Sequence, residues 1–203
     1  LKKSGIRSIH DLQGKRVSVG PAGGTPDVYG RLLLDVLGVK PARIVNLGWE
    51  STNDQMKDGL MDACLAWGGI PQPSVLEMET THPVTVFGLS EPDIRKMVEK
   101  YPFLSRAVLP RGTYKSAAAD LPTIAVGNFL IAHKDLDPDF VYHAVKATFD
   151  QRGELLKVHR SAAETRVELI VRSVIPVHAG AIRYYQEKGV AIPAALIPPE
   201  GRR

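Results

Sequence analysis

At residues 17–29 the chain reads Val17-Ser18-Val19-Gly20-Pro21-Ala22-Gly23-Gly24-Thr25-Pro26-Asp27-Val28-Tyr29. Val17 and Val19 are typical of a short buried strand, and Thr25 followed by Pro26 predicts a helix start, with Thr25 as N-cap. We therefore expect a strand that runs into a helix N-terminus through a glycine-rich loop. Such a loop exposes unpaired backbone N–H groups at the positive end of a helix dipole, which favours an anion such as a carboxylate or phosphate.

A glycine-rich turn between a strand and a helix is also common where it serves tight packing alone. The loop lacks both nucleotide-binding patterns. No lysine follows the glycines, as G-x-x-x-x-G-K-[ST] would require, and residues 20–24 do not read G-x-G-x-x-G. The sequence thus disfavours a nucleotide-binding enzyme and leaves a small-anion site or a purely structural turn.

Up to residue 90 the pattern alternates strands with helices. The helix that begins at Thr25 is expected to end at Gly38; strands are expected at 43–47, 60–66 and 84–89, and helices are expected to begin at Ser51 and Pro71. This order predicts an α/β fold with a mostly parallel sheet and helices on both faces. Ligands bind at the carboxyl ends of such strands, so the loops 20–25, 48–51 and 67–70 are expected to converge.

After residue 90 the character of the sequence changes. A charged helix is expected at 91–101, an irregular connector at 109–114 and a strand at 123–126, and the chain is mainly helical from Pro138 onward. The proline-rich residues 193–203 are expected to be loose. With one convincing strand, this part reads as half a domain whose other strands lie elsewhere.

Composition and spacing argue against several functions. The net charge is only +4 and the basic residues are scattered among acidic ones, so no nucleic-acid partner is expected. The six histidines show no metal spacing, no C-x-x-C or G-x-S-x-G occurs, and Cys64 is alone in an apolar run typical of a buried structural thiol. We expect no metal, no cofactor and no catalytic residues, hence a protein that is not an enzyme.

Three groups of motifs carry a resemblance to a known family. They are residues 11–20 with Gly23-Gly24-Thr25, then residues 58–63, and finally Tyr114, residues 123–126 and residues 178–189. In this order they resemble the solute-binding subunits of TRAP transporters of the TAXI class. The family commonly has serine where Gly23 stands, so backbone amides and Thr25 are left as the donors here.

The resemblance implies a periplasmic, type II-like binding protein with two α/β lobes that close over a small organic acid. It implies delivery of that ligand, a dicarboxylate or an amino acid such as glutamate, to TRAP membrane permease subunits. Residues 6–90 would form lobe two, and residues 91–203 the crossover and the mainly helical C-terminal share of lobe one. The N-terminal share of lobe one would precede Leu1, so the first lobe is incomplete in this chain.

Six residues are candidates for the ligand site. Gly23, Gly24 and Thr25 are placed there by the loop, although Thr25 would also serve as a plain cap. The other candidates are Ser51, which also reads as an N-cap; Trp67, which could instead pack in the core; and Tyr114, which could instead pack at a hinge.

Two other functions remain open at this point. An effector-sensing domain of a transcription regulator would share the lobed architecture, and an upstream helix-turn-helix segment would favour it. An enzyme acting on an acidic metabolite would need a nucleophile and a base that converge in the cleft, which the sequence does not supply.

Overall fold

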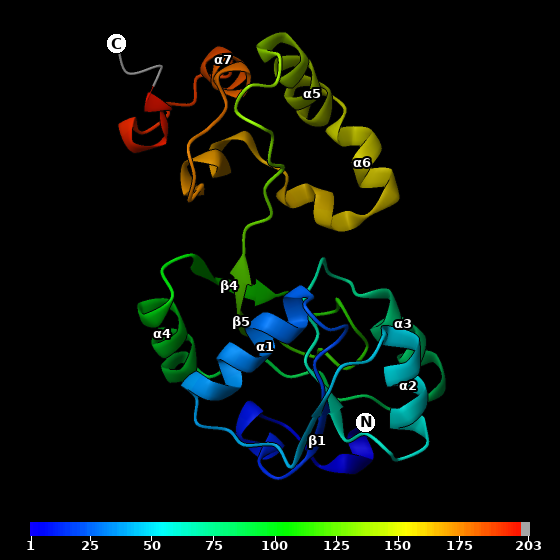
Figure 1. Cartoon of the computed structure of the whole chain (residues 1–203). Coiled ribbons are helices and arrows are strands. Elements are labelled where there is room, and N and C mark those ends of the chain that lie inside the picture. Colours follow the sequence, from blue (N-terminus) through cyan, green and yellow to red (C-terminus); the bar gives the residue numbers. More distant parts are fainter. Residues whose placement is uncertain (200–203) are drawn as a thin grey trace. The chain divides into compact units, whose positions relative to one another are not determined.

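The computed structural model describes residues 1–199 and contains two compact units, Leu1–Val126 and the part from Gly127 onward. Figure 1 draws the helices and strands of both units. Each unit has its own core of buried apolar side chains. The boundary between the two units falls after Val126. The expected lobe limits at residues 6–90 and 91–203 refer to the two lobes of the family and stay a prediction.

The first unit is a mixed α/β unit. Its elements are, in chain order, β1 (Arg16–Ser18), α1 (Thr25–Val36), β2 (Arg43–Val45), α2 (Trp49–Lys57), β3 (Ala63–Cys64), α3 (Pro73–Thr81), α4 (Glu91–Lys100), β4 (Leu104–Leu109) and β5 (Leu121–Val126), preceded by short 3-10 turns at Lys2–Ser4 and Ile9–Leu12.

The first three strands form a parallel sheet in the order β2-β1-β3. Val17 pairs with Ile44 on one side and with Ala63 on the other, so β1 is central. Because side chains alternate along a strand, Val17 and Val19 point to one face and Ser18 to the other.

Helices cover both faces of this sheet. On the first face, Leu33 and Leu34 of α1 pack in one core cluster with Val17 and Val19. On the second face, Met56 of α2 packs with side chains that include Val45 and Cys64. The prediction of a parallel sheet with helices on both faces is therefore confirmed for β1, β2 and β3.

Three helix starts differ from the sequence expectation. Gly24, not Thr25, is the N-cap of α1, and Thr25 is its first residue. Helix α2 begins at Trp49 after Gly48, so Ser51 lies inside it and caps nothing. Helix α3 begins at Pro73 and not at Pro71, which follows a cis peptide bond.

The prediction of a strand at 84–89 was wrong, and strand β4 was not predicted from the sequence. Residues 84–89 carry no strand, and β4 and β5 pair with each other as an antiparallel ladder. Pro122 in β5 has no N–H to offer, and its carbonyl accepts a hydrogen bond from the Leu89 N–H at 2.8 Å. Residues 84–89 therefore form no ladder with β5, and this single hydrogen bond connects the two segments.

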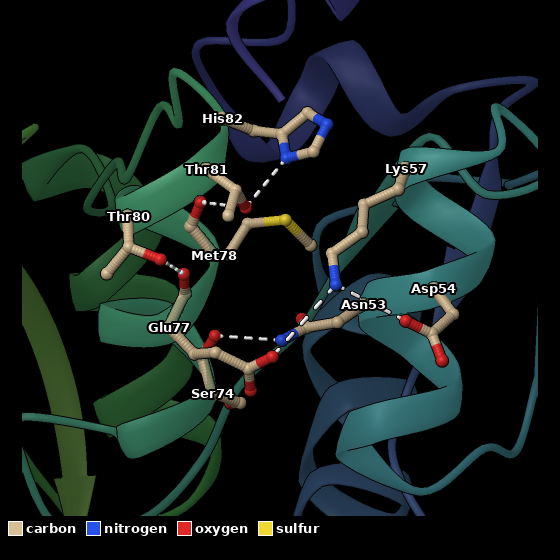
Figure 2. A network of polar contacts seen from close by, with 9 residues as sticks. All are labelled: Asn53, Asp54, Lys57, Ser74, Glu77, Met78, Thr80, Thr81 and His82. Carbon is tan, nitrogen blue, oxygen red and sulfur yellow. Dashed lines mark hydrogen bonds and ion pairs between the residues drawn. The ribbon is translucent and has the colours of Figure 1, made fainter.

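Helices α2 and α3 lie side by side and are joined by polar contacts (Figure 2). The buried Asn53 side chain donates to the Ser74 carbonyl at 2.9 Å. Lys57 lies 3.3 Å from Asp54 and 4.0 Å from Glu77 in exposed ion pairs, which contribute little. The Asn53 bond is thus the main polar link between the two helices in this network.

The second unit is helical in its described residues. It contains α5 (Pro138–Asp150), α6 (Arg152–Val158) and α7 (Ala179–Glu187), with 3-10 turns at Arg160–Glu164, Val167–Arg172 and Ala194–Leu196. Helix α7 packs on α5, with Tyr184 stacked on Phe149 at 5.8 Å between ring centroids. Leu196 is buried, so the segment expected to be loose is ordered in part; its residues 200–203 lie outside the described residues.

Candidate functional site

The loop that follows β1 is bent by its glycines and lies at the carboxyl edge of the sheet. Gly20 has φ of +74° and Gly23 has φ of +72°, a region that favours glycine. A Cβ at Gly20 would also lie 3.1 Å from the Pro26 side chain. Because β1, β2 and β3 are parallel neighbours, the loops after all three strands leave the same edge of the sheet, as the sequence predicted.

The carboxylate of Asp27 reaches back from the first turn of α1 onto this loop. It accepts a hydrogen bond from the Gly23 N–H at 3.0 Å and another from Arg31 Nε at 2.6 Å. Arg31 also donates to the Asn46 side chain at 3.0 Å, and Asn46 donates to the Gly20 carbonyl at 3.1 Å. The loop after β1 is therefore tied both to α1 and to the residue that follows β2.

These contacts favour the charged form of Asp27. Hydrogen bonds from the Asn46 side chain, the Gly23 amide and Arg31 lower the pKa of Asp27 from 3.8 to about 2. Asp27 is therefore a carboxylate at neutral pH, and its charge is balanced locally by the guanidinium of Arg31.

The loop still carries free donors. The Gly23 and Gly24 amides donate internally, to Asp27 and to the Pro21 carbonyl. Within residues 1–199, the amides of Ala22, Thr25 and Asp27 donate no hydrogen bond, and the exposed Thr25 hydroxyl has no partner. The arrangement can present three N–H groups and one hydroxyl to an anionic group at the positive end of the α1 dipole.

Beneath the loop lies a buried pair of hydroxyls. Ser18 Oγ and Thr52 Oγ1 share a hydrogen bond of 2.8 Å, and both residues are completely buried. The Gly20 N–H points to Ser18 Oγ at 3.5 Å. This pair connects the end of β1 to α2 on the face of the sheet opposite α1.

The remaining sequence candidates lie in different surroundings. Ser51 is exposed on α2, beside Thr52. Trp67 is half-buried, and its ring lies 5.3 Å from that of Tyr29 on α1. No hydrogen bond or ring contact in the described part of the chain joins Ser51 or Tyr114 to the loop 20–25.

Tyr114 is buried in the turn between β4 and β5. Its hydroxyl accepts a hydrogen bond from the Gln72 N–H at 2.6 Å, and burial raises its pKa. Glu79 of α3 accepts hydrogen bonds from the next two amides, those of Lys115 at 2.9 Å and Ser116 at 2.8 Å. Tyr114 thus fastens this turn within the first unit, and its role toward a ligand stays a prediction.

Sequence reasoning missed Asp27, Arg31 and Asn46. One signal was present, because an acidic residue at the third position of a helix typically reaches back to an amide just before the helix. Asp27 and Arg31 also have the i,i+4 spacing of a helical ion pair. Asn46 carried no such signal, since its approach to Gly20 depends on how β2 pairs with β1.

Other reactive groups of the described residues serve structural contacts. His10 Nε2 lies 3.1 Å from the buried carboxylate of Asp93, and Ser90 Oγ donates to Asp93 and not to His10. Burial raises the pKa of the Cys64 thiol, which fits the structural role expected of it. His178 caps α7 by accepting from the Gly180 N–H at 3.1 Å.

Residues 1–199 contain no group of three or more His, Cys, Asp or Glu side chains arranged to hold a metal ion. In the same residues, no helix combines the length and the apolar character that a membrane span requires.

Comparison with protein families finds a match that covers most of the chain. The model of the NMT1-like family matches residues 1–189. This is a family of periplasmic solute-binding-like proteins, which are typically extracytoplasmic and bind small molecules. The parallel sheet and the loop with free amides at its carboxyl edge agree with that assignment. The chain belongs to the NMT1-like family and has, in general terms, the solute-binding role of that family.

Proposed function

We propose that this protein captures a small organic acid outside the cytoplasm and delivers it to a TRAP-type secondary transporter. The ligand class is a dicarboxylate or an amino acid such as glutamate. The observation that carries the ligand class is the set of free donors on the loop and the first turn of α1: the amides of Ala22, Thr25 and Asp27 and the Thr25 hydroxyl. Hydrogen bonds from such donors to an ionised acceptor are shorter and stronger than those between neutral groups.

The transporter class rests on the TAXI-like order of motifs in the sequence. These are residues 11–20 with Gly23-Gly24-Thr25, residues 58–63, and Tyr114 with residues 123–126 and 178–189. In this chain they lie at β1 with its loop, between α2 and the start of β3, in the turn before β5, in β5, and at α7. The family match supports the general solute-binding role. The TRAP permease is the proposed membrane partner.

Binding without chemical conversion is also part of the proposal. The donors at the loop are backbone amides and an alcohol, which recognise an anion and hold it. The nearest resemblance to a catalytic triad, His10 with Asp93 and Ser90, has its serine on the carboxylate instead of on the imidazole. That geometry does not activate a serine nucleophile.

The first test is isothermal titration calorimetry of the protein with a panel of dicarboxylates and amino acids, followed by the variant Thr25→Val. Loss of a hydrogen bond to a charged ligand costs about 1.5–3 kcal/mol, so affinity for the ligand found is expected to fall about 10- to 150-fold. The matched control is Thr80→Val on the exposed end of α3, where affinity should stay at the wild-type value.

Unchanged affinity in Thr25→Val would remove the loop from the site while leaving the general solute-binding role in place. Saturable binding of neutral or cationic solutes, with no response to any carboxylate, would overturn the proposed ligand class.

A further inference from the structure

Asp27 connects three parts of the first unit at the end of the sheet. Its carboxylate accepts from the Gly23 N–H in the loop and from Arg31 one turn further along α1. Arg31 continues to Asn46 after β2, and Asn46 returns to the Gly20 carbonyl at the start of the same loop. The network therefore holds the loop 20–24 at both ends.

A loop of this composition needs such support. Gly20, Gly23 and Gly24 have wide conformational freedom, and ordering a glycine on binding costs more entropy than ordering any other residue. A site that is already ordered before the ligand arrives avoids that cost and binds more tightly. The hydrogen bond from Gly23 to Asp27 lies between the free amide of Ala22 and those of Thr25 and Asp27, so it fixes the spacing of the donors.

The charge of Asp27 does not oppose an anionic ligand strongly. Arg31 Nε lies 2.6 Å from the carboxylate, so the pair is close to neutral when seen from the loop. Removal of Asp27 is therefore expected to act mainly through the loss of loop order.

We propose that Asp27 is a positioning residue of the ligand site, which holds the loop 20–24 in its binding conformation through the Gly23 amide, with Arg31 and Asn46 as its supports. This inference rests on the proposed function, since it concerns the same site.

The first experiment measures loop order without any ligand. Backbone amide exchange with solvent is followed by NMR in the wild type, in Asp27→Ala and in Asp139→Ala. Asp139 is a matched control because it is also a first-turn aspartate paired with an arginine, Arg183 at 2.8 Å, but in the second unit. Gly23 is expected to exchange at least about tenfold faster in Asp27→Ala and at the wild-type rate in Asp139→Ala. Unchanged exchange at Gly23 would overturn the proposal.

The second experiment measures affinity by calorimetry with the carboxylate panel. Asp27→Ala is expected to weaken binding about tenfold, while Asp139→Ala binds as the wild type does. Asp27→Asn keeps an oxygen that can accept from Gly23, and it should restore most of the affinity. The melting temperature is expected to shift by a similar amount in Asp27→Ala and in Asp139→Ala. Weaker binding in Asp27→Ala alone then comes from the loss of positioning and not from general destabilisation.

The outcomes distinguish the two proposals. Faster exchange at Gly23 with unchanged affinity would overturn the positioning role and leave the proposed function standing. A wild type that binds no member of the panel would overturn the proposed function, and the ligand role of Asp27 with it.

Discussion

At the scale of single residues, the buried hydroxyls of Ser18 and Thr52 show how the floor of the loop is built. Each is the polar partner of the other at 2.8 Å, and neither residue has any exposed surface. A buried polar group without a partner costs about 1–3 kcal/mol, so the two side chains depend on each other.

The variant Thr52→Val keeps the side-chain shape but removes the hydroxyl that pairs with Ser18 at 2.8 Å, so Ser18 Oγ keeps only its longer contact with the Gly20 N–H. It is expected to lower the free energy of unfolding by about 1–3 kcal/mol, measured by urea denaturation. Adding Ser18→Ala should recover part of this loss, because the double variant buries no unpaired hydroxyl. A double variant that loses the full sum of both single effects would contradict the pairing.

Residue patterns predicted the location of the candidate site better than the roles of its members. Val17, Val19 and Pro26 indicated a strand, a loop and a helix, and these are present. Thr25 did not become the cap, because Asp27 reaches the amide of Gly23 while Gly24 provides the cap backbone. Which carboxylate reaches which amide depends on the backbone angles of the glycines, and sequence spacing does not fix these.

At the scale of elements, an ion pair joins the edge strand β3 to the central strand β1. Asp62, just before β3, accepts from the Arg16 backbone N–H at 2.8 Å and from its guanidinium at 2.9 and 2.6 Å. These bonds from Arg16 lower the pKa of Asp62 from 3.8 to about 2. The shift means that the folded protein prefers the charged form of Asp62.

A lowered pKa in the folded state gives a stabilisation that is complete above pH 3.8 and is lost as pH falls toward about 2. Asp62→Asn is therefore expected to flatten the dependence of the unfolding free energy on pH between about 4 and 2. Urea denaturation at a series of pH values measures this dependence. Arg16→Gln should flatten the same interval, and a steep wild-type slope retained in both variants would contradict the assignment.

Sequence periodicity was sufficient to predict some of the helices and strands, but not all of them. Helix α1 and the central strand β1 were predicted because their apolar residues recur at helical or alternating spacing and their ends carry glycine and proline. The 84–89 segment has equally apolar residues, yet no ladder forms, because Pro122 lacks an N–H. Strand β4 was missed because its pairing partner, β5, lies across a turn of 11 residues (110–120) that holds Tyr114.

At the scale of the whole molecule, the division after Val126 can be tested directly. Residues 127–132 are exposed, and among the described residues they make no hydrogen bond. Phe129, Leu130 and Ile131 are apolar side chains with 40%, 86% and 73% of their surface exposed. A protease that cuts before large apolar residues meets little resistance at such a segment.

Limited proteolysis with thermolysin is expected to cut first within residues 128–132 and to give two fragments, identified by mass spectrometry. The double variant Leu130→Asp, Ile131→Asp should slow this cut, because it removes the preferred side chains. A first cut within residues 110–120 would contradict the division, since that turn is fastened by Tyr114 and Glu79.

The strand order β2-β1-β3 also has a consequence for biosynthesis. The ribosome makes the centre of this sheet first, and its two neighbours arrive only with Arg43–Val45 and Ala63–Cys64. Until then the nascent polypeptide carries a strand with both edges open, which is the kind of segment that other chains can join. A chaperone that shields Val17 and Val19 until residue 64 has emerged would keep this strand from joining another chain.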